Sequence, residues 1–176
     1  MQSPLTLAEI NALDQAQFVA HFGAVFEHAP WVAAAAWQRR PFADLDALHR
    51  AMVEVVAAAP PAQQEALIRA HPDLAGTAAL AGEVTSASAR EQAGAGLNAL
   101  TPAEYARFTQ LNRAYHERFG FPFIICVREH TKASILAAFA ARLHHDRPTE
   151  IAIALTEIAK IARLRLQDLI APAPPA

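Results

Sequence analysis

The chain has 176 residues, of which 53% are hydrophobic and 18% are charged, with 15 Lys and Arg against 17 Asp and Glu. This length favours one domain with its own core, and the low charge excludes wholesale disorder. The near-neutral charge balance argues against a nucleic-acid-binding protein. The single cysteine, Cys126, excludes an intramolecular disulfide and any cysteine-rich metal site.

Targeting signals are absent from both ends of the sequence. The first thirteen residues contain Glu9 and no Lys or Arg, so they do not form a basic region before an apolar one. No stretch approaches the ~20 apolar residues that span a bilayer. Residues 171–176 contain only Ala and Pro and predict a flexible tail without a peroxisomal signal. We therefore expect a cytoplasmic protein.

Composition and capping residues predict an all-α fold. Alanine, the best helix former, supplies 43 of the 176 residues. Asp14 caps the first predicted helix, and Pro72 ends the fourth because a proline disfavours the helical conformation at the residue before it. The helices predicted in the first half of the chain are 14–26, 30–37, one from Asp44 or Asp46 to about residue 60, and 62 to about 71.

The second half begins with a strong helix signal at Thr101-Pro102-Ala103-Glu104, which has the residues of a capping box and a proline at the first helical position. This helix runs to Phe119 and stops at Gly120. The run 121–127 is rich in β-branched residues and contains a proline, so it is either a buried extended segment or the start of a helix. Two more helices complete a compact single domain over residues 1–170 with no significant sheet: 131–145 and 148–170.

Periodicity in the last helix separates two arginines. At 100° per residue, Ile151, Leu155, Ile158, Ala162 and Leu169 lie within about 40° of Ile151 and form the core-facing stripe. Arg165 lies inside this stripe, whereas Arg163 lies on the opposite, solvated side. An inward arginine needs a carboxylate, a row of carbonyls or an anionic ligand. An internal ion pair and a ligand-binding role are equally compatible with the pattern.

Two short motifs combine side chains suited to acid–base chemistry with ordinary structural explanations. His71 is held by Pro72 just past a helix end, where it either caps the last carbonyls or acts as a rigid acid or base. Ser88-Ala89-Arg90-Glu91 has the form of a capping box, and a helix N-terminus also suits an anionic group. Gln92 offers both donors and an acceptor to a urea or carboxamide.

Motifs for the common cofactors are missing. There is no His-Glu-x-x-His, no phosphate-binding glycine loop and no Gly-x-Ser-x-Gly. Cys126 lies in an apolar run and is expected to be an inert core thiol. We therefore expect no metal, nucleotide or covalent cofactor.

Taken together, these segments resemble a known family. The pattern is His71-Pro72-x-Leu-Ala-Gly, then Ser88-x-x-Glu-Gln-x-x-Gly-Leu, then Leu111-Asn-x-x-Tyr leading into Phe119-Gly-Phe-Pro-Phe-Ile, and finally Lys160-Ile-Ala-x-Leu-Arg-Leu. It is similar to 2-oxo-4-hydroxy-4-carboxy-5-ureidoimidazoline (OHCU) decarboxylase of urate degradation, over roughly residues 5 to 170.

The resemblance implies an all-helical, cofactor-free carboxy-lyase, usually a homodimer, that converts OHCU to (S)-allantoin. It places the catalytic groups on His71, Glu91 and Arg165, which we expect to converge on one dry pocket sized for a five-membered ring. Some family members are fused to the preceding hydroxyisourate hydrolase, which suggests functional coupling between the two steps. The substrate contacts that it implies are Pro72, Ser88, Gln92 and the main chain of the segment containing Phe121, Phe123, Ile124 and Ile125.

Two other functions compete with this interpretation. An alanine-rich helical module with one inward arginine could bind a small anion or a partner helix without catalysis. A related enzyme could instead hydrolyse a ureido compound. Stereochemical bias in allantoin separates the enzyme from the binder, and CO2 release without urea release separates the decarboxylase from the hydrolase.

Overall fold

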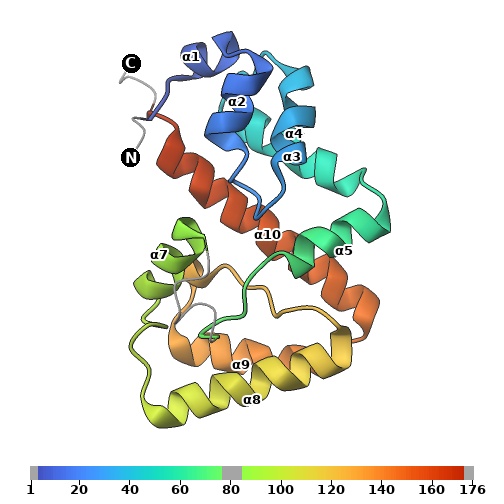
Figure 1. Cartoon of the computed structure of the whole chain (residues 1–176), viewed down its shortest axis with the longest axis vertical. Coiled ribbons are helices and arrows are strands. Elements are labelled where there is room, and N and C mark those ends of the chain that lie inside the picture. Colours follow the sequence, from blue (N-terminus) through green and yellow to red (C-terminus); the bar gives the residue numbers. More distant parts are fainter. Residues whose placement is uncertain (1–3, 77–84, 173–176) are drawn as a thin grey trace. The chain divides into compact units, whose positions relative to one another are not determined.

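The computed structural model describes residues 4–76 and 85–172, and over these residues it is helical without a named strand (Figure 1). The predicted all-α class is therefore confirmed. One isolated parallel bridge joins Leu5 to Ile170. The helices are α1 (Leu7–Ala12), α2 (Gln15–Phe22), α3 (Pro30–Ala36), η1 (Trp37–Arg39), α4 (Leu45–Ala57), α5 (Pro61–Arg69), α7 (Ser86–Gly94), α8 (Pro102–Phe119), η2 (Val127–Glu129), α9 (Lys132–Arg142) and α10 (Arg147–Leu169).

The chain divides into two compact units. The first unit comprises Met1–Leu67 and Ala159–Ala176, and the second comprises Ile68–Ile158. The long helix α10 begins in the second unit and ends in the first. The expected single domain over residues 1–170 stays a prediction. Of the predicted flexible tail, residues 173–176 lie outside the described residues.

Apolar side chains of short helices form the core of the first unit. Phe18 and Phe22 of α2 lie with ring centroids 4.8 Å apart, and Leu48 and Met52 of α4 are fully buried. The two ends of the unit are joined through Leu5, whose N–H donates to the carbonyl of Leu169 at 3.1 Å. Main-chain hydrogen bonds therefore connect the stretch before α1 to the end of α10.

Side-chain caps set most helix starts where the sequence predicts them. Asp14 and Asp44 accept hydrogen bonds from main-chain N–H groups of α2 and α4, which settles the choice between Asp44 and Asp46. Thr101 forms the predicted capping box with Glu104, and Gly120 ends α8 with a φ of 77°. Helix α1 was not predicted, although its Thr6–Glu9 capping box has the same Thr-x-x-Glu signature.

Two predicted helices are too long. Helix α2 ends at Phe22 and not at Phe26, because Gly23 follows and glycine is unfavourable within a helix. Helix α9 ends at Arg142 and not at His145. Asp146 lies between these two helices, and its carboxylate accepts from the N–H of Thr149 at 2.8 Å. It thereby caps α10, which begins at Arg147, one residue before the predicted start at Pro148.

An aromatic cluster forms the core of the second unit and buries the segment 121–127. The rings of Phe123 and Phe139 are stacked with centroids 3.8 Å apart, and Tyr115 meets Phe123 edge-on at 5.3 Å. Each residue from Phe121 to Val127 is buried. The buried extended segment is thus confirmed, and the alternative helix is limited to the short η2 turn at its end.

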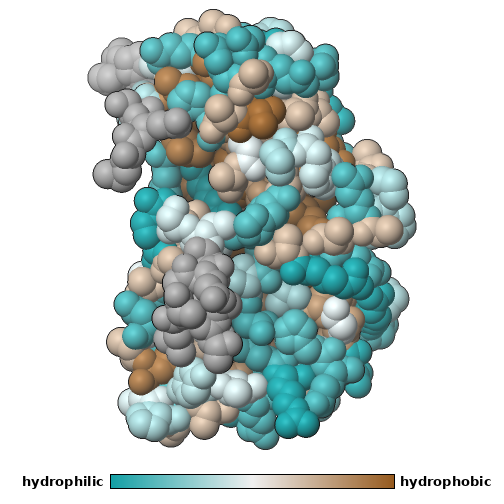
Figure 2. Space-filling view, viewed as in Figure 1, coloured by the Kyte–Doolittle hydropathy of each residue, from teal (hydrophilic) through white to brown (hydrophobic). Residues whose placement is uncertain are grey.

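Polar side chains cover the outer face of α8. Arg107, Gln110, Arg113 and Glu117 are exposed, while Phe108, Leu111 and Tyr115 on the other face are buried. Hydrophilic residues dominate the lower right of the space-filling view (Figure 2). Within the described residues, no helix is both long enough and apolar enough to cross a membrane.

The capping carboxylate of α8 predicts a pH-dependent stability. Two hydrogen bonds lower the pKa of Glu104 from 4.5 to about 2. The larger effect comes from the main-chain N–H of Thr101, and the next from Lys132, whose Nζ lies 2.9 Å from Oε1 of Glu104. A carboxylate with a lowered folded-state pKa stabilises the fold above its unfolded pKa, and this effect is lost as the pH falls through the folded value. We expect Glu104→Gln to lower the melting temperature above about pH 5 and the difference to vanish toward pH 2.

The measurement is thermal unfolding followed by circular dichroism across this pH range. Glu117→Gln, which changes an exposed carboxylate on the same helix, is the control. A melting-temperature difference for Glu104→Gln that stays constant from neutral pH to pH 2 would contradict the assignment.

Candidate functional site

His71 lies in a buried turn directly after α5. The helix ends at Arg69, and the main-chain N–H of His71 donates to the carbonyl of Ile68 at 3.2 Å. The side chain is buried, with 8% of the residue exposed, and Pro72 follows it. Ala75 then adopts a φ of 51°, which is rare for a residue other than glycine. The structure therefore confirms that His71 is held just past a helix end.

Side chains from two helices hold the residues that follow His71. The amide of Gln92 in α7 accepts from the Ala75 N–H at 2.9 Å and donates to the Asp73 carbonyl at 3.3 Å. Asn112 of α8 donates to the Leu74 carbonyl at 2.8 Å. Three successive residues of the turn are thus hydrogen-bonded to buried amide side chains. This fixation offsets the unfavourable φ of Ala75.

The start of α7 differs from the sequence prediction. Ser88 was expected to cap the helix with Glu91 as its partner, but Thr85 is the N-cap and its hydroxyl accepts from the Ser88 N–H at 3.3 Å. Ser88 therefore lies inside the first turn and is buried. The predicted capping box is wrong because the Thr85 side chain already occupies the capping position. Glu91 lies further along the helix and is half-buried.

The segment Phe121–Ile125 offers main-chain groups that a helix would use internally. In the part of the chain that the structure describes, no acceptor meets the N–H groups of Phe121, Phe123, Ile124 and Ile125. The side chains of Phe121 and Phe123, in contrast, belong to the aromatic core. Any contact of these two residues with a ligand would therefore involve the main chain.

Cys126, the residue after this stretch, is a buried and free thiol. Burial, and to a smaller extent the carboxylates of Glu129, Glu157 and Glu91, raise the pKa of its thiol to about 11. The thiol is free and protonated at neutral pH, as expected for an inert core cysteine.

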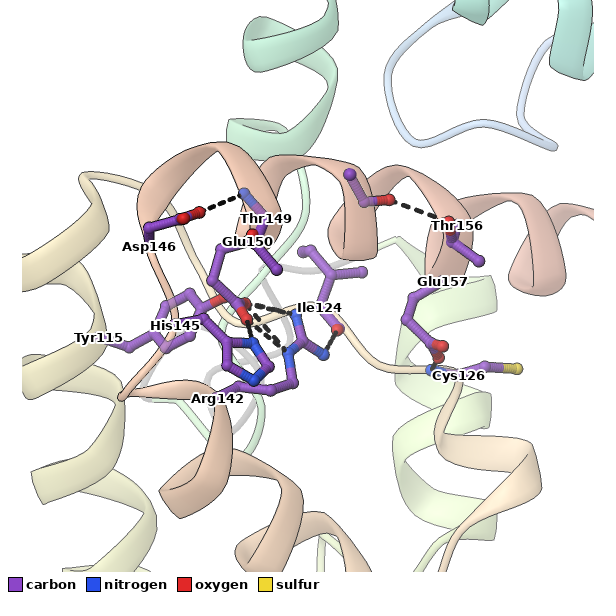
Figure 3. A network of polar contacts seen from close by, with 11 residues as sticks. Tyr115, Ile124, Cys126, Arg142, His145, Asp146, Thr149, Glu150, Thr156 and Glu157 are labelled. Atoms are coloured by element: carbon purple, nitrogen blue, oxygen red, sulfur yellow. Dashed lines mark hydrogen bonds and ion pairs between the residues drawn. The ribbon is translucent and has the colours of Figure 1, made fainter.

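A buried polar network lies next to the segment 121–127, and none of its members is among the predicted site residues (Figure 3). Glu150 of α10 is fully buried and accepts from the Tyr115 hydroxyl, from Nε and Nη2 of Arg142 at 3.0 and 2.9 Å, and from Nδ1 of His145 at 2.6 Å. Burial and the hydrogen bond to Glu150 raise the pKa of Tyr115 well above its usual range. Tyr115 is therefore a neutral donor in this network.

Two buried charged side chains, Arg142 and Glu157, bind the main chain of the segment 121–127. Arg142 donates from Nη1 to the Ile124 carbonyl at 2.7 Å, and Glu157 accepts the Cys126 N–H at 2.8 Å (Figure 3). Glu150 and Glu157 are seven residues apart and so share one face of α10. Two carboxylates repeated at this spacing on a largely apolar helix are the sequence signal that could have identified them.

Arg165 lies in the first unit and forms a buried ion pair. Its Nη1 donates to Oε2 of Glu27 at 2.9 Å and to the Val25 carbonyl at 3.3 Å, and both charged side chains are almost inaccessible. The inward direction of Arg165 is confirmed, and so is the internal ion pair that the pattern allowed. Arg163 is part-exposed on the other side of α10, where it pairs with Asp46.

The predicted site residues are therefore distributed over both units. Within the second unit, Gln92 joins the His71 turn to α7, the helix that also carries Ser88 and Glu91. Arg165 belongs to the first unit, and the predicted convergence of the three catalytic groups stays a prediction. No group of three or more His, Cys, Asp or Glu suited to a metal ion occurs among residues 4–76 and 85–172.

Comparisons with known proteins identify close relatives along nearly the whole chain. A family model described as OHCU decarboxylase matches residues 11–167. The chain is 43% identical over 166 residues to 2-oxo-4-hydroxy-4-carboxy-5-ureidoimidazoline decarboxylase of Amia calva, covering 94% of this chain and 95% of that protein. It is 44% identical over 164 residues to the protein of the same name from Haloferax volcanii, covering 93% and 95%.

Longer relatives and solved structures agree with this match. The uric acid degradation bifunctional protein PucL of Bacillus subtilis is 42% identical over 94% of this chain, which spans 33% of that protein. A crystal structure of (S)-allantoin synthase matches with a TM-score of 0.76 at 31% identity, over 94% of this chain and 54% of that one. An OHCU decarboxylase crystallised in the presence of (S)-allantoin shares the fold, with a TM-score of 0.66 at 20% identity over 91% of this chain and 100% of that one.

The two hydrogen bonds of Gln92 predict a measurable contribution to stability. Gln92→Leu leaves the buried Ala75 N–H without its acceptor, and we expect the free energy of unfolding to fall by about 1–3 kcal/mol. Urea denaturation measures the change. Arg90→Ala, an exposed position on the same helix, should alter it by no more than about 0.5 kcal/mol. Equal effects of the two substitutions would rule out a structural role for the Gln92 amide.

Proposed function

Since the chain belongs to the OHCU decarboxylase family, we infer that it removes CO2 from 2-oxo-4-hydroxy-4-carboxy-5-ureidoimidazoline and forms (S)-allantoin in urate degradation. The observation that carries this function is the family match over residues 11–167, which includes His71, Glu91 and Arg165. We assign the activity to residues 1–170 acting as one decarboxylase domain. The buried His71 turn and the open main chain of the segment 121–125 support this assignment.

The chemistry needs no electron sink beyond the substrate. Loss of CO2 leaves an electron pair on a ring carbon, and the conjugated C=N and C=O groups of the ring delocalise it. The enzyme must orient the carboxylate perpendicular to the ring, stabilise the enolate-like intermediate and deliver a proton to one face. Orientation and fixed donors can supply this, at about 10²–10³ in rate for a well-placed donor.

In this scheme His71 is the general acid or base. It moves a proton at the 4-hydroxyl or at the prochiral carbon, and its fixed position after α5 restricts delivery to one face. Glu91 orients His71 or exchanges a proton with it. The buried environment of the turn favours such transfer because water does not compete for the imidazole.

Arg165 has the role of binding an anionic or carbonyl oxygen of the substrate. Its ion pair with Glu27 is compatible with this role, because Glu27 fixes the guanidinium and compensates its charge when no substrate is bound. The hydrogen bonds from Nη1 to Glu27 and to the Val25 carbonyl fix the direction of the guanidinium. The side chain is thus oriented before the ligand arrives.

The remaining predicted contacts divide into side-chain and main-chain groups. Ser88 and Gln92 contact the ureido and ring edges, and Pro72 packs against the ring. The amide of Gln92 has one further N–H and one further lone pair beyond its bonds to the turn. Phe121, Phe123, Ile124 and Ile125 contribute through their main chain.

We extend the proposal to the setting of the enzyme. We expect a cytoplasmic homodimer that works without metal or organic cofactor. The bifunctional relative in Bacillus subtilis, named for uric acid degradation, supports coupling to another step of that route. In this proposal, the preceding step is the opening of hydroxyisourate by its hydrolase.

The role of His71 predicts both a rate and a stereochemical effect. We expect His71→Asn to lower the rate of (S)-allantoin formation at least about 100-fold, because general acid–base catalysis contributes about 10²–10⁴. Freshly generated substrate decays spontaneously to racemic allantoin, so circular dichroism of the product reports the enzymatic share. A variant that forms the (S) product at the parent rate removes His71 from the mechanism, and racemic product from the parent protein indicates a binder without catalysis.

The two neighbouring arginines of α10 predict unequal effects. We expect Arg165→Gln to lower kcat/KM at least about tenfold, since a charge-assisted hydrogen bond contributes about 1.5–3 kcal/mol. Arg163→Gln should change it less than about threefold, because its pair with Asp46 is part-exposed. Steady-state kinetics on folded protein tests this, and similar losses in both variants would refute the distinction.

A further inference from the structure

The main chain around Ile125 is held from one side by two buried charged side chains. Arg142 donates to the Ile124 carbonyl at 2.7 Å, and Glu157 accepts the Cys126 N–H at 2.8 Å. Arg142 and Glu157 are both 7% exposed. They come from different helices, α9 and α10, yet they reach the two peptide units that flank a single residue.

Peptide planarity turns these two contacts into a constraint on Ile125. The C=O and N–H of one trans peptide unit point in opposite directions. Because the Ile124 carbonyl points at Arg142, the Ile125 N–H points away from Arg142. Because the Cys126 N–H points at Glu157, the Ile125 carbonyl points away from Glu157. Neither group of Ile125 has a hydrogen-bond partner in the described part of the chain.

The guanidinium of Arg142 is also held by side chains outside the segment. Its Nε and Nη2 bind the Glu150 carboxylate, and its guanidinium carbon lies 4.3 Å from the centroid of the Phe123 ring. The Tyr115 hydroxyl and Nδ1 of His145 hold Glu150 in turn. The carbonyl of Ile124 is therefore held at the end of a chain of buried contacts that leaves the guanidinium little freedom.

We propose that Arg142 and Glu157 are positioning residues that orient the N–H and C=O of Ile125 toward the ring of the substrate. This inference rests on the proposed function and deepens it. A neighbouring donor and acceptor match the N–H and C=O of a cyclic amide or urea. Apolar side chains of similar size are often as stabilising as buried charged ones, so stability alone does not explain why charges occupy these two positions. Orienting the N–H and C=O of Ile125 is a function that explains the buried charges of Arg142 and Glu157.

Three variants on one helix turn test the role of Glu157. Glu157→Gln keeps a carbonyl oxygen that accepts from Cys126, Glu157→Ala removes the acceptor, and Thr156→Ala is the matched control. Thr156 is exposed and its hydroxyl donates only within α10, to the Ala152 carbonyl at 2.9 Å (Figure 3). We expect KM to rise about tenfold in Glu157→Ala, to stay within about threefold in Glu157→Gln and to be unchanged in the control.

The outcomes separate positioning from other roles. A Glu157→Ala variant with the parent KM and kcat overturns the inference, and so does a Glu157→Gln variant as impaired as Glu157→Ala, because the negative charge would then matter and not the hydrogen bond. If the parent protein shows no turnover and no (S) bias, the proposed function itself fails. Turnover by the parent with an unaffected Glu157→Ala variant refutes only the positioning role.

A second measurement does not depend on the folding of a variant. Parent protein labelled with ¹⁵N at isoleucine is titrated with (S)-allantoin, and its amide resonances are followed by NMR. We expect the Ile125 amide proton to shift downfield on binding, as a new hydrogen-bond donor does, and the Ile135 amide, inside helix α9, to stay in place. Binding without a shift at Ile125 would overturn the inference.

Discussion

The fully buried carboxylate of Glu150 is the interaction on which the interior of the second unit depends. An isolated carboxylate is very costly in an apolar interior, so it must be paired and hydrogen-bonded. Its partners come from α8, from α9 and from the connection before α10, through Tyr115, Arg142 and His145. Satisfying this one charge therefore determines how three helices meet. It also leaves the third nitrogen of Arg142 directed at the Ile124 carbonyl.

Local signals in the sequence predict most of the fold. Capping residues act within a few residues of chain, so Thr101, Asp44 and Gly120 mark helix ends that the structure confirms. The same reasoning fails where two local signals compete. Thr85 takes the capping position that Ser88 was expected to hold, because the helix begins earlier than the Ser-x-x-Glu motif suggests. Helix phase likewise predicts the inward direction of Arg165.

What the sequence does not predict is the partner of each buried charge. Glu27 lies 138 residues before Arg165, and Glu157 lies 31 residues after Cys126. Helix phase gives the side on which a residue lies but carries no information about which distant residue meets it there. The network around Glu150 was missed for the same reason, although the seven-residue repeat of Glu150 and Glu157 marks one polar face. The resemblance in sequence identifies candidate catalytic residues without identifying the groups that orient them.

An all-helical protein has few main-chain groups to offer a ligand, because helices use their N–H and C=O groups internally. Main-chain recognition must therefore come from breaks between helices, and a break is a source of freedom unless side chains hold it. In the second unit both relevant breaks are held in this way. Gln92 and Asn112 hold the turn after His71, and Arg142 and Glu157 hold the segment around Ile125. Because every holding side chain comes from a helix, the rigidity of the helices is transferred to the two stretches that are not helical, which is the condition that the proposed one-sided proton delivery to a small ring requires.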